Sequence, residues 1–87
     1  MQIQIDPHTL ERATERGATE AEIYDTLLNG FDVPAKQGRR GKAAIYQYKA
    51  TRLNKYYEQK RVEVYYTIER DKIITVTVYV FYGSWEG

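Results

Sequence analysis

One histidine and two arginines recur at every fourth residue near the start of the chain: His8, Arg12 and Arg16. In an α-helix this spacing keeps the three side chains within an arc of about 80° on one face. A neutral imidazole beside two guanidinium groups can act as a general base near a phosphodiester. The spacing therefore indicates phosphate chemistry. The alternative is an ordinary solvated face, on which Glu11 and Glu15 pair with the arginines.

Other common catalytic chemistries lack the residues that they need. The chain has no cysteine and only one histidine, so it offers neither thiolates nor the ligand spacing of a metal site. Ser84 is the only serine and lies near the C-terminus. The stretch "GRRGK" precedes a predicted strand, whereas a phosphate-binding loop precedes a helix. We therefore expect no metal and no cofactor, which leaves acid–base chemistry on phosphate.

The net charge of +1 conceals a strongly basic middle third. Residues 35–61 hold nine bases and one acid, together with four tyrosines. Cations that contact phosphates and rings that stack on bases are the usual means of holding single-stranded nucleic acid. The alternative is a solubilising stretch in which the tyrosines cover a sheet. We expect RNA as the partner.

Length and composition indicate one globular domain over residues 1–87. Hydrophobic residues make up 43% of the chain and charged residues 29%, which is typical of a folded domain and not of a disordered one. The N-terminus lacks the basic and apolar regions of a signal peptide. The most apolar stretch, "IITVTVYVFY", is too short to span a membrane. We expect a cytoplasmic protein without a membrane segment.

Local signals predict two consecutive helices. The first is expected over residues 7–16, with Asp6 as its N-cap and Gly17 just beyond its end. A Thr-x-x-Glu capping box opens the second, expected over residues 20–28, and an Asn-Gly pair ends it. On the first helix, Leu10, Ala13 and Thr14 are expected to face the core.

The rest of the chain predicts a sheet. Residues 33–37 and 42–50 are expected to form a hairpin around "QGRRGK", and "RVEVYYTI" and "KIITVTVYVFY" read as two long paired strands. Residues 1–5 could add a strand at an edge. The fold class is therefore α+β, with two N-terminal helices packed on an antiparallel sheet of about four strands.

Alternation divides the two long strands into two faces. The face expected against the helices holds Val62, Val64, Tyr66, Ile68, Ile74, Val76, Val78 and Val80. The opposite face holds Arg61, Glu63, Tyr65, Thr67, Thr75, Thr77, Tyr79 and Phe81. Two tyrosines and an Arg/Glu pair suit a binding face, although good β-formers on a half-solvated sheet would look similar.

Three segments occur in this order along the chain: "HTLERATERG", "ATEAEI" and "IITVTVYVFYGSW". They resemble a family of small prokaryotic proteins of unknown function that is grouped with the RelE-like and BrnT-like toxins. The wider fold group also contains the barnase-like, EndoU and colicin RNases. The resemblance implies a RelE-like, RNase-toxin-like domain, metal-independent endoribonuclease activity and an antitoxin protein as partner.

By position, His8, Arg12 and Arg16 match the helix motif of that family, and Tyr79 falls in its last strand. We assign His8 as general base or acid, Arg12 to the phosphorane, and Glu63 or Tyr79 as second proton carrier. The expected RNA-binding residues are Arg16, Lys42, Lys49, Arg61 and Tyr65. Pairing His8 with Glu63 requires that the helix face and the polar sheet face share one cleft.

Two other classes of function fit the same residues. One is a non-catalytic RNA- or protein-binding module, in which the arginines and tyrosines bind and His8 merely starts a helix. The other is a subunit that acts only with a partner chain, docked on an edge strand or a helix face. The endoribonuclease, acting as the toxin of a toxin–antitoxin pair, is the preferred hypothesis.

Overall fold

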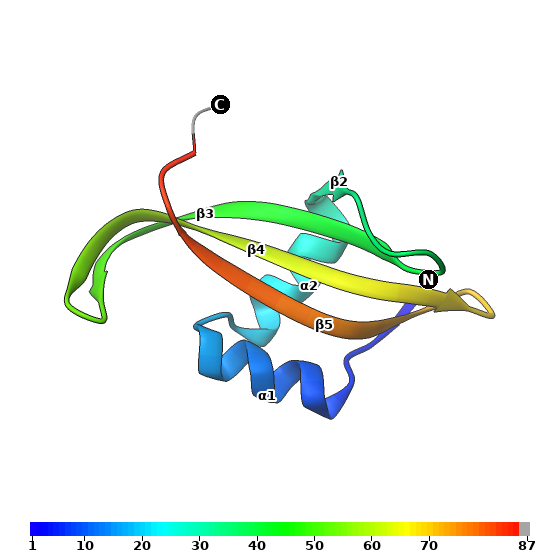
Figure 1. Ribbon diagram of the computed structural model, residues 1–87. Coiled ribbons are helices and arrows are strands. Elements are labelled where there is room, and N and C mark those ends of the chain that lie inside the picture. Colours follow the sequence, from blue (N-terminus) through cyan, green and yellow to red (C-terminus); the bar gives the residue numbers. More distant parts are fainter. Residues whose placement is uncertain (86–87) are drawn as a thin grey trace.

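Two helices lie on one face of a five-stranded sheet in the computed structural model, which describes residues 1–85 (Figure 1). The helices are α1 (Pro7–Arg16) and α2 (Glu20–Asn29). The strands are β1 (Gln2–Gln4), β2 (Phe31–Val33), β3 (Arg40–Arg52), β4 (Lys55–Glu69) and β5 (Lys72–Gly83). They are ordered β1-β5-β4-β3-β2. The α+β class and the placement of both helices on the sheet are confirmed.

The sheet has five strands and not four, because a short strand lies at each of its two edges. β1 pairs with residues 72–74 of β5 and is parallel to it, so the sheet is not wholly antiparallel. β2 pairs with residues 41–43 of β3 and ends at Val33. Pro34 follows, and it has no N–H to continue the ladder. The predicted strand over 33–37 is therefore wrong, since residues 34–39 form a loop.

The helix ends follow the predicted caps. The Asp6 carboxylate accepts a hydrogen bond from the backbone N–H of His8 at the start of α1. Thr19 and Glu22 form a reciprocal capping box at the start of α2. Gly17 ends α1 at φ +96°, in the left-handed region that favours glycine. A Cβ there would also collide with the Tyr82 hydroxyl of β5.

The core lies between the helices and the central strands. Its buried residues are Ala13, Ala18, Ile23, Leu27, Val62, Val64, Tyr66 and Val78. Ile68 was expected here but is exposed near the end of β4. On α1 the expectation for Thr14 is also wrong, because Thr14 is exposed and Thr9 is buried in its place.

A bulge in β5 changes which side chains face the helices. Tyr65 pairs with Thr77 but Tyr66 pairs with Thr75, so Val76 is an extra residue between two successive pairs. Thr75 is therefore buried under α1, where its hydroxyl accepts a hydrogen bond from the backbone N–H of Asp6. Ile74 pairs with Thr67 on the opposite face. On β5 the predicted faces are therefore correct from Thr77 onward, whereas Ile74 and Thr75 lie on the faces opposite to those predicted.

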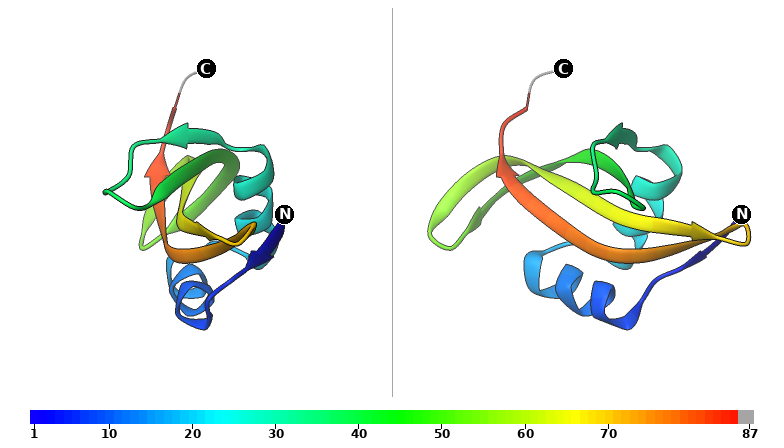
Figure 2. Two further views of the ribbon diagram at one scale, coloured as in Figure 1. Left: turned by 90° about the vertical axis from the view of Figure 1, so that its right-hand side faces the viewer. Right: turned by 45° about the vertical axis from the view of Figure 1, so that its right-hand side comes forward.

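The hairpin of β3 and β4 extends beyond the rest of the sheet (Figures 1 and 2). Pairing between β4 and β5 begins at Gln59, which is opposite Gly83. The residues of β4 before Gln59 pair only with β3. No helix of the described chain is long and apolar enough to cross a membrane.

Candidate functional site

The face of the sheet opposite the helices carries a polar and aromatic cluster, which we call the open face. On β4 and β5 its pairs are Arg61 with Phe81, Glu63 with Tyr79 and Tyr65 with Thr77. Phe31 of β2 joins it, because the Arg61 guanidinium lies 5.2 Å from the centre of the Phe31 ring. Alternation along β4 and β5 thus places the three pairs on one face as predicted, and Phe31 is an addition from β2.

Glu63 is the carboxylate at the centre of the open face. One oxygen accepts a hydrogen bond from Arg61 Nε (2.8 Å) and the other from the Tyr65 hydroxyl (2.7 Å). The Glu63 side chain is only 14% exposed. A carboxylate can accept about four hydrogen bonds, so Glu63 keeps the capacity to accept one from a ligand.

Tyr65 acts as a hydrogen-bond donor. Burial, and then its hydrogen bond to Glu63, raise the pKa of Tyr65 to about 12. The hydroxyl therefore keeps its proton at neutral pH and holds Glu63 in place. The Tyr65 ring meets the Tyr79 ring edge to face at 5.9 Å, and Tyr79 stacks on Phe81 at 6.4 Å. Tyr79 and Phe81 are 43% and 47% exposed, so part of their ring surface is accessible to a base.

Arg16 reaches this cluster from the helix side. Its Nη1 donates a hydrogen bond to the backbone carbonyl of Val78 on β5. Its guanidinium lies 5.0 Å from the centre of the Tyr79 ring, within the range of a cation–π contact. The contact is possible because β1 covers only residues 72–74 of β5, which leaves the edge accessible at Val78.

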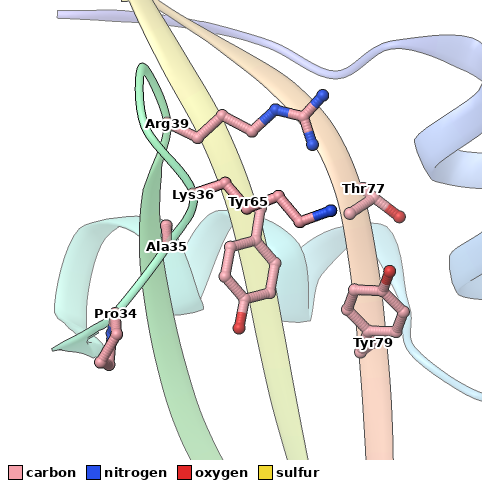
Figure 3. Close-up of a pocket in the computed structure, with 7 residues that line it drawn as sticks. All are labelled: Pro34, Ala35, Lys36, Arg39, Tyr65, Thr77 and Tyr79. Atoms are coloured by element: carbon pink, nitrogen blue, oxygen red, sulfur yellow. The ribbon is translucent and has the colours of Figure 1, made fainter.

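A pocket of about 430 Å³ lies beside the cluster, beneath the loop that joins β2 and β3. Its lining residues are Pro34, Ala35, Lys36, Arg39, Tyr65, Thr77 and Tyr79. Lys36 and Arg39 extend from the loop across β4 toward β5 (Figure 3). None of the ion pairs among residues 1–85 includes Lys36, Arg39 or Arg16. These three cations are therefore available to an anionic ligand.

His8 and Arg12 lie elsewhere. The His8 side chain is 86% exposed, and its Nδ1 is 3.4 Å from the Asp6 carboxylate. The backbone N–H of Asp6 donates a hydrogen bond to Thr75 on the helix-covered face, whereas Glu63 lies on the open face. The start of α1 and Glu63 are therefore on opposite sides of the sheet. Arg12 is exposed on the same helix. The structure therefore does not bring His8 and Glu63 into one cleft.

Lys42 and Lys49 are also outside the cluster. Lys42 is opposite Val64 of the core and forms a 2.9 Å ion pair with Asp32. The hydrogen bond with Asp32 raises the pKa of Lys42, and the same contact lowers the pKa of Asp32. Lys49 is exposed in a bulge of the projecting hairpin. Of the predicted residues, the open face unites Arg16, Arg61, Glu63, Tyr65 and Tyr79.

The sequence reasoning missed the contribution of the loop. Lys36 and Arg39 belong to the basic middle third, but the glycines of "QGRRGK" indicate only a turn and place neither side chain at a site. A turn that carries two arginines between its glycines and is flanked by Lys36 and Lys42 is a signal for a cationic loop that can contact an anion. Alternation is the only sequence signal for Thr77, and Phe31 has none because β2 is too short to show a period.

The molecule is thus a small two-layer α+β domain whose helix-free sheet face holds cationic, aromatic and carboxylate groups. A family model described as "Domain of unknown function (DUF4258)" matches residues 5–80. The chain belongs to this family. Comparisons with curated proteins and with solved structures find no match.

Proposed function

We propose that the protein is an endoribonuclease that binds single-stranded RNA on the open face and cleaves it without a metal ion. The observation that carries the proposal is a nearly buried carboxylate, Glu63, in a surface whose other charged groups are Arg16, Lys36, Arg39 and Arg61. The cations suit phosphates and the rings suit bases.

The position of Glu63 favours cleavage over binding alone. A carboxylate in the middle of a phosphate-binding face repels the ligand, unless it accepts a proton or a hydrogen bond from it. The 2′-hydroxyl of RNA is such a donor. A pure binding module is the second candidate, and in that case Glu63 would only orient Arg61 and Tyr65.

The proposed reaction follows from these groups. Glu63 takes the proton of a 2′-hydroxyl, whose oxygen attacks the adjacent phosphorus and forms a new P–O bond. Arg16 and the loop cations stabilise the charge of the phosphorane. The bond to the 5′-oxygen breaks, and Tyr79, which is 43% exposed, gives that oxygen a proton from its hydroxyl. The products are a 2′,3′-cyclic phosphate and a 5′-hydroxyl. His8 has no part in this scheme.

The test is RNA cleavage in the presence of a chelator. Wild-type protein should give discrete products from total cellular RNA. Glu63→Gln keeps the shape of the side chain but cannot take a proton, so cleavage should fall by at least about a hundredfold, while RNA still shifts on a gel. His8→Ala is the control and should cleave like the wild type.

Two results would contradict the proposal. If Glu63→Gln cleaves at the wild-type rate, the carboxylate is not the base. If the wild type binds RNA and leaves it intact, the protein is a binding module.

The resemblance to RelE-like and BrnT-like toxins extends the proposal to the cell. The protein would act in the cytoplasm as a toxin that an antitoxin protein holds in check. Expression of the wild type should slow growth, and Glu63→Gln should not. Equal growth of the two strains would count against toxicity.

A further inference from the structure

The part of the β3–β4 hairpin that extends past the sheet, residues 48–58, forms a feature that we call the basic arm (Figure 2). It carries three bases, Lys49, Arg52 and Lys55, and one acid, Glu58. An isolated two-stranded ribbon is only marginally stable in water. Contacts with the rest of the molecule must therefore hold the arm in place.

Tyr82 of β5 provides most of these contacts. The rings of Tyr48 and Tyr57 lie 5.1 and 5.5 Å from the Tyr82 ring, and the Arg52 guanidinium lies 4.9 Å from it. Arg52 also donates a hydrogen bond to the backbone carbonyl of Glu15 on α1 (3.1 Å). The arm is thus fastened to both layers of the domain.

The same contacts connect the arm to the open face through Arg16. The Tyr82 hydroxyl donates a hydrogen bond to the backbone carbonyl of Arg16 (2.7 Å), and the Arg16 side chain lies over Tyr79. Arg16 therefore stands between the two surfaces at the edge of β5. A strand held on the open face could continue past Arg16 toward the arm.

The arm presents groups that suit a nucleic acid. Lys49 and Lys55 are exposed, as are Leu53 (90%) and Tyr56 (54%). A second pocket of about 370 Å³ separates the arm from the end of β5, and Lys55, Tyr57 and Tyr82 contribute to its lining. Among the described residues that line this pocket, the one carboxylate is that of Glu58, which accepts a hydrogen bond from the Tyr56 hydroxyl.

We propose that the basic arm is a second contact site for the RNA, with phosphates on Lys49 and Lys55 and a base against the tyrosines of this pocket. The inference rests on the RNA ligand proposed above. Glu63 lies eight positions after Lys55 along β4, which at about 3.3 Å per position is roughly 26 Å. A short oligonucleotide would therefore fill the open face alone, whereas a longer one would reach both sites.

The experiment compares two double variants that remove the same charge from opposite ends of the sheet. Lys49→Asn with Lys55→Gln changes the arm, and Arg70→Asn with Lys72→Gln changes the β4–β5 turn. Lys49 (φ 46°) and Arg70 (φ 50°) are both left-handed, a conformation that asparagine adopts readily. The asparagine substitutions are therefore matched in backbone strain, and thermal unfolding checks that both proteins fold.

Binding is measured by fluorescence anisotropy with unmodified RNA of about 4 and about 20 nucleotides. Every protein in this comparison, including the one with wild-type arm and turn, also carries Glu63→Gln, so the RNA keeps its 2′-hydroxyls and is not cleaved. The arm variant should bind the long RNA about tenfold more weakly, and its salt slope should fall by about 1.4, the value for two phosphates on a single strand. Binding of the short RNA should not change. The turn variant should match the wild type for both lengths.

Equal affinity of the two variants for long RNA would overturn the inference and leave the open face untouched, as expected if the arm instead docks a protein. A loss that is the same for short and long RNA would overturn it as well, because the arm would then not be a separate site. A wild type that binds neither RNA would overturn this inference and the proposed function together.

Discussion

Arg16 of helix α1 lies with its guanidinium 5.0 Å from the centre of the Tyr79 ring, on the face of the sheet that the helices do not cover. One side chain thus passes round the edge of β5 and joins both layers. Arg16 and Gly17, the two residues at the end of α1, therefore have different roles. The arginine supplies a cation to the open face, and the glycine makes the close approach to β5 possible.

Arg16→Lys tests the first role. Lysine keeps the charge but loses the planar group that stacks on Tyr79 and bonds Val78, so RNA binding should weaken by about tenfold. Arg12→Lys is the matched control on the same helix and should bind like the wild type. Anisotropy with long unmodified RNA measures both, in proteins that also carry Glu63→Gln so that the RNA is not cleaved. Equal weakening would show that the open face does not distinguish the two arginines.

Gly17→Ala tests the second role. Alanine at φ +96° costs about 1 to 2 kcal/mol of unfolding free energy, and its Cβ also collides with the Tyr82 hydroxyl. Urea denaturation should therefore show a loss larger than the backbone cost alone. Tyr82→Phe removes the hydroxyl, so in that background Gly17→Ala should cost less. Strict additivity of the two substitutions would disprove the steric part.

Lys36→Ala with Arg39→Ala tests the loop above the pocket. Neither side chain takes part in an ion pair among residues 1–85, so stability in urea should change little. Removing two phosphate contacts should lower the salt slope of RNA binding by about 1.4. In contrast to the arm variant, this one should also bind short RNA more weakly. Unchanged binding of short RNA would place the ligand away from the loop.

Tyr46 predicts how stability responds to alkaline pH. Burial, and then its hydrogen bond to Asp25, raise the pKa of Tyr46 to about 12. A pKa raised on folding stabilises the protein below the unfolded value, near 10, and this stabilisation is lost as pH rises toward 12. The unfolding free energy should therefore fall across that window. Tyr46→Phe should show a shallower fall, and an identical profile would contradict the assignment.

The local elements were predictable because their signals are local. Caps depend on residues three or four apart, so Asp6, Gly17 and the Thr19–Glu22 box define both helices within a residue or so. The faces of β4 follow from strict alternation over a long strand. The three-residue strands β1 and β2 are too short to show any period, and they gain their place only by pairing with β5 and β3.

The amino-acid sequence by itself determined the two helices, the long strands and the set of groups that share the β4 side of the open face, because each depends on neighbours in the chain. Only the tertiary structure decided that Thr75 turns inward at a bulge, that Arg16 crosses the β5 edge, and that His8 stays on the far side from Glu63. Helical spacing places side chains on a common helix face, but the packing of that helix against the sheet determines what the face can reach.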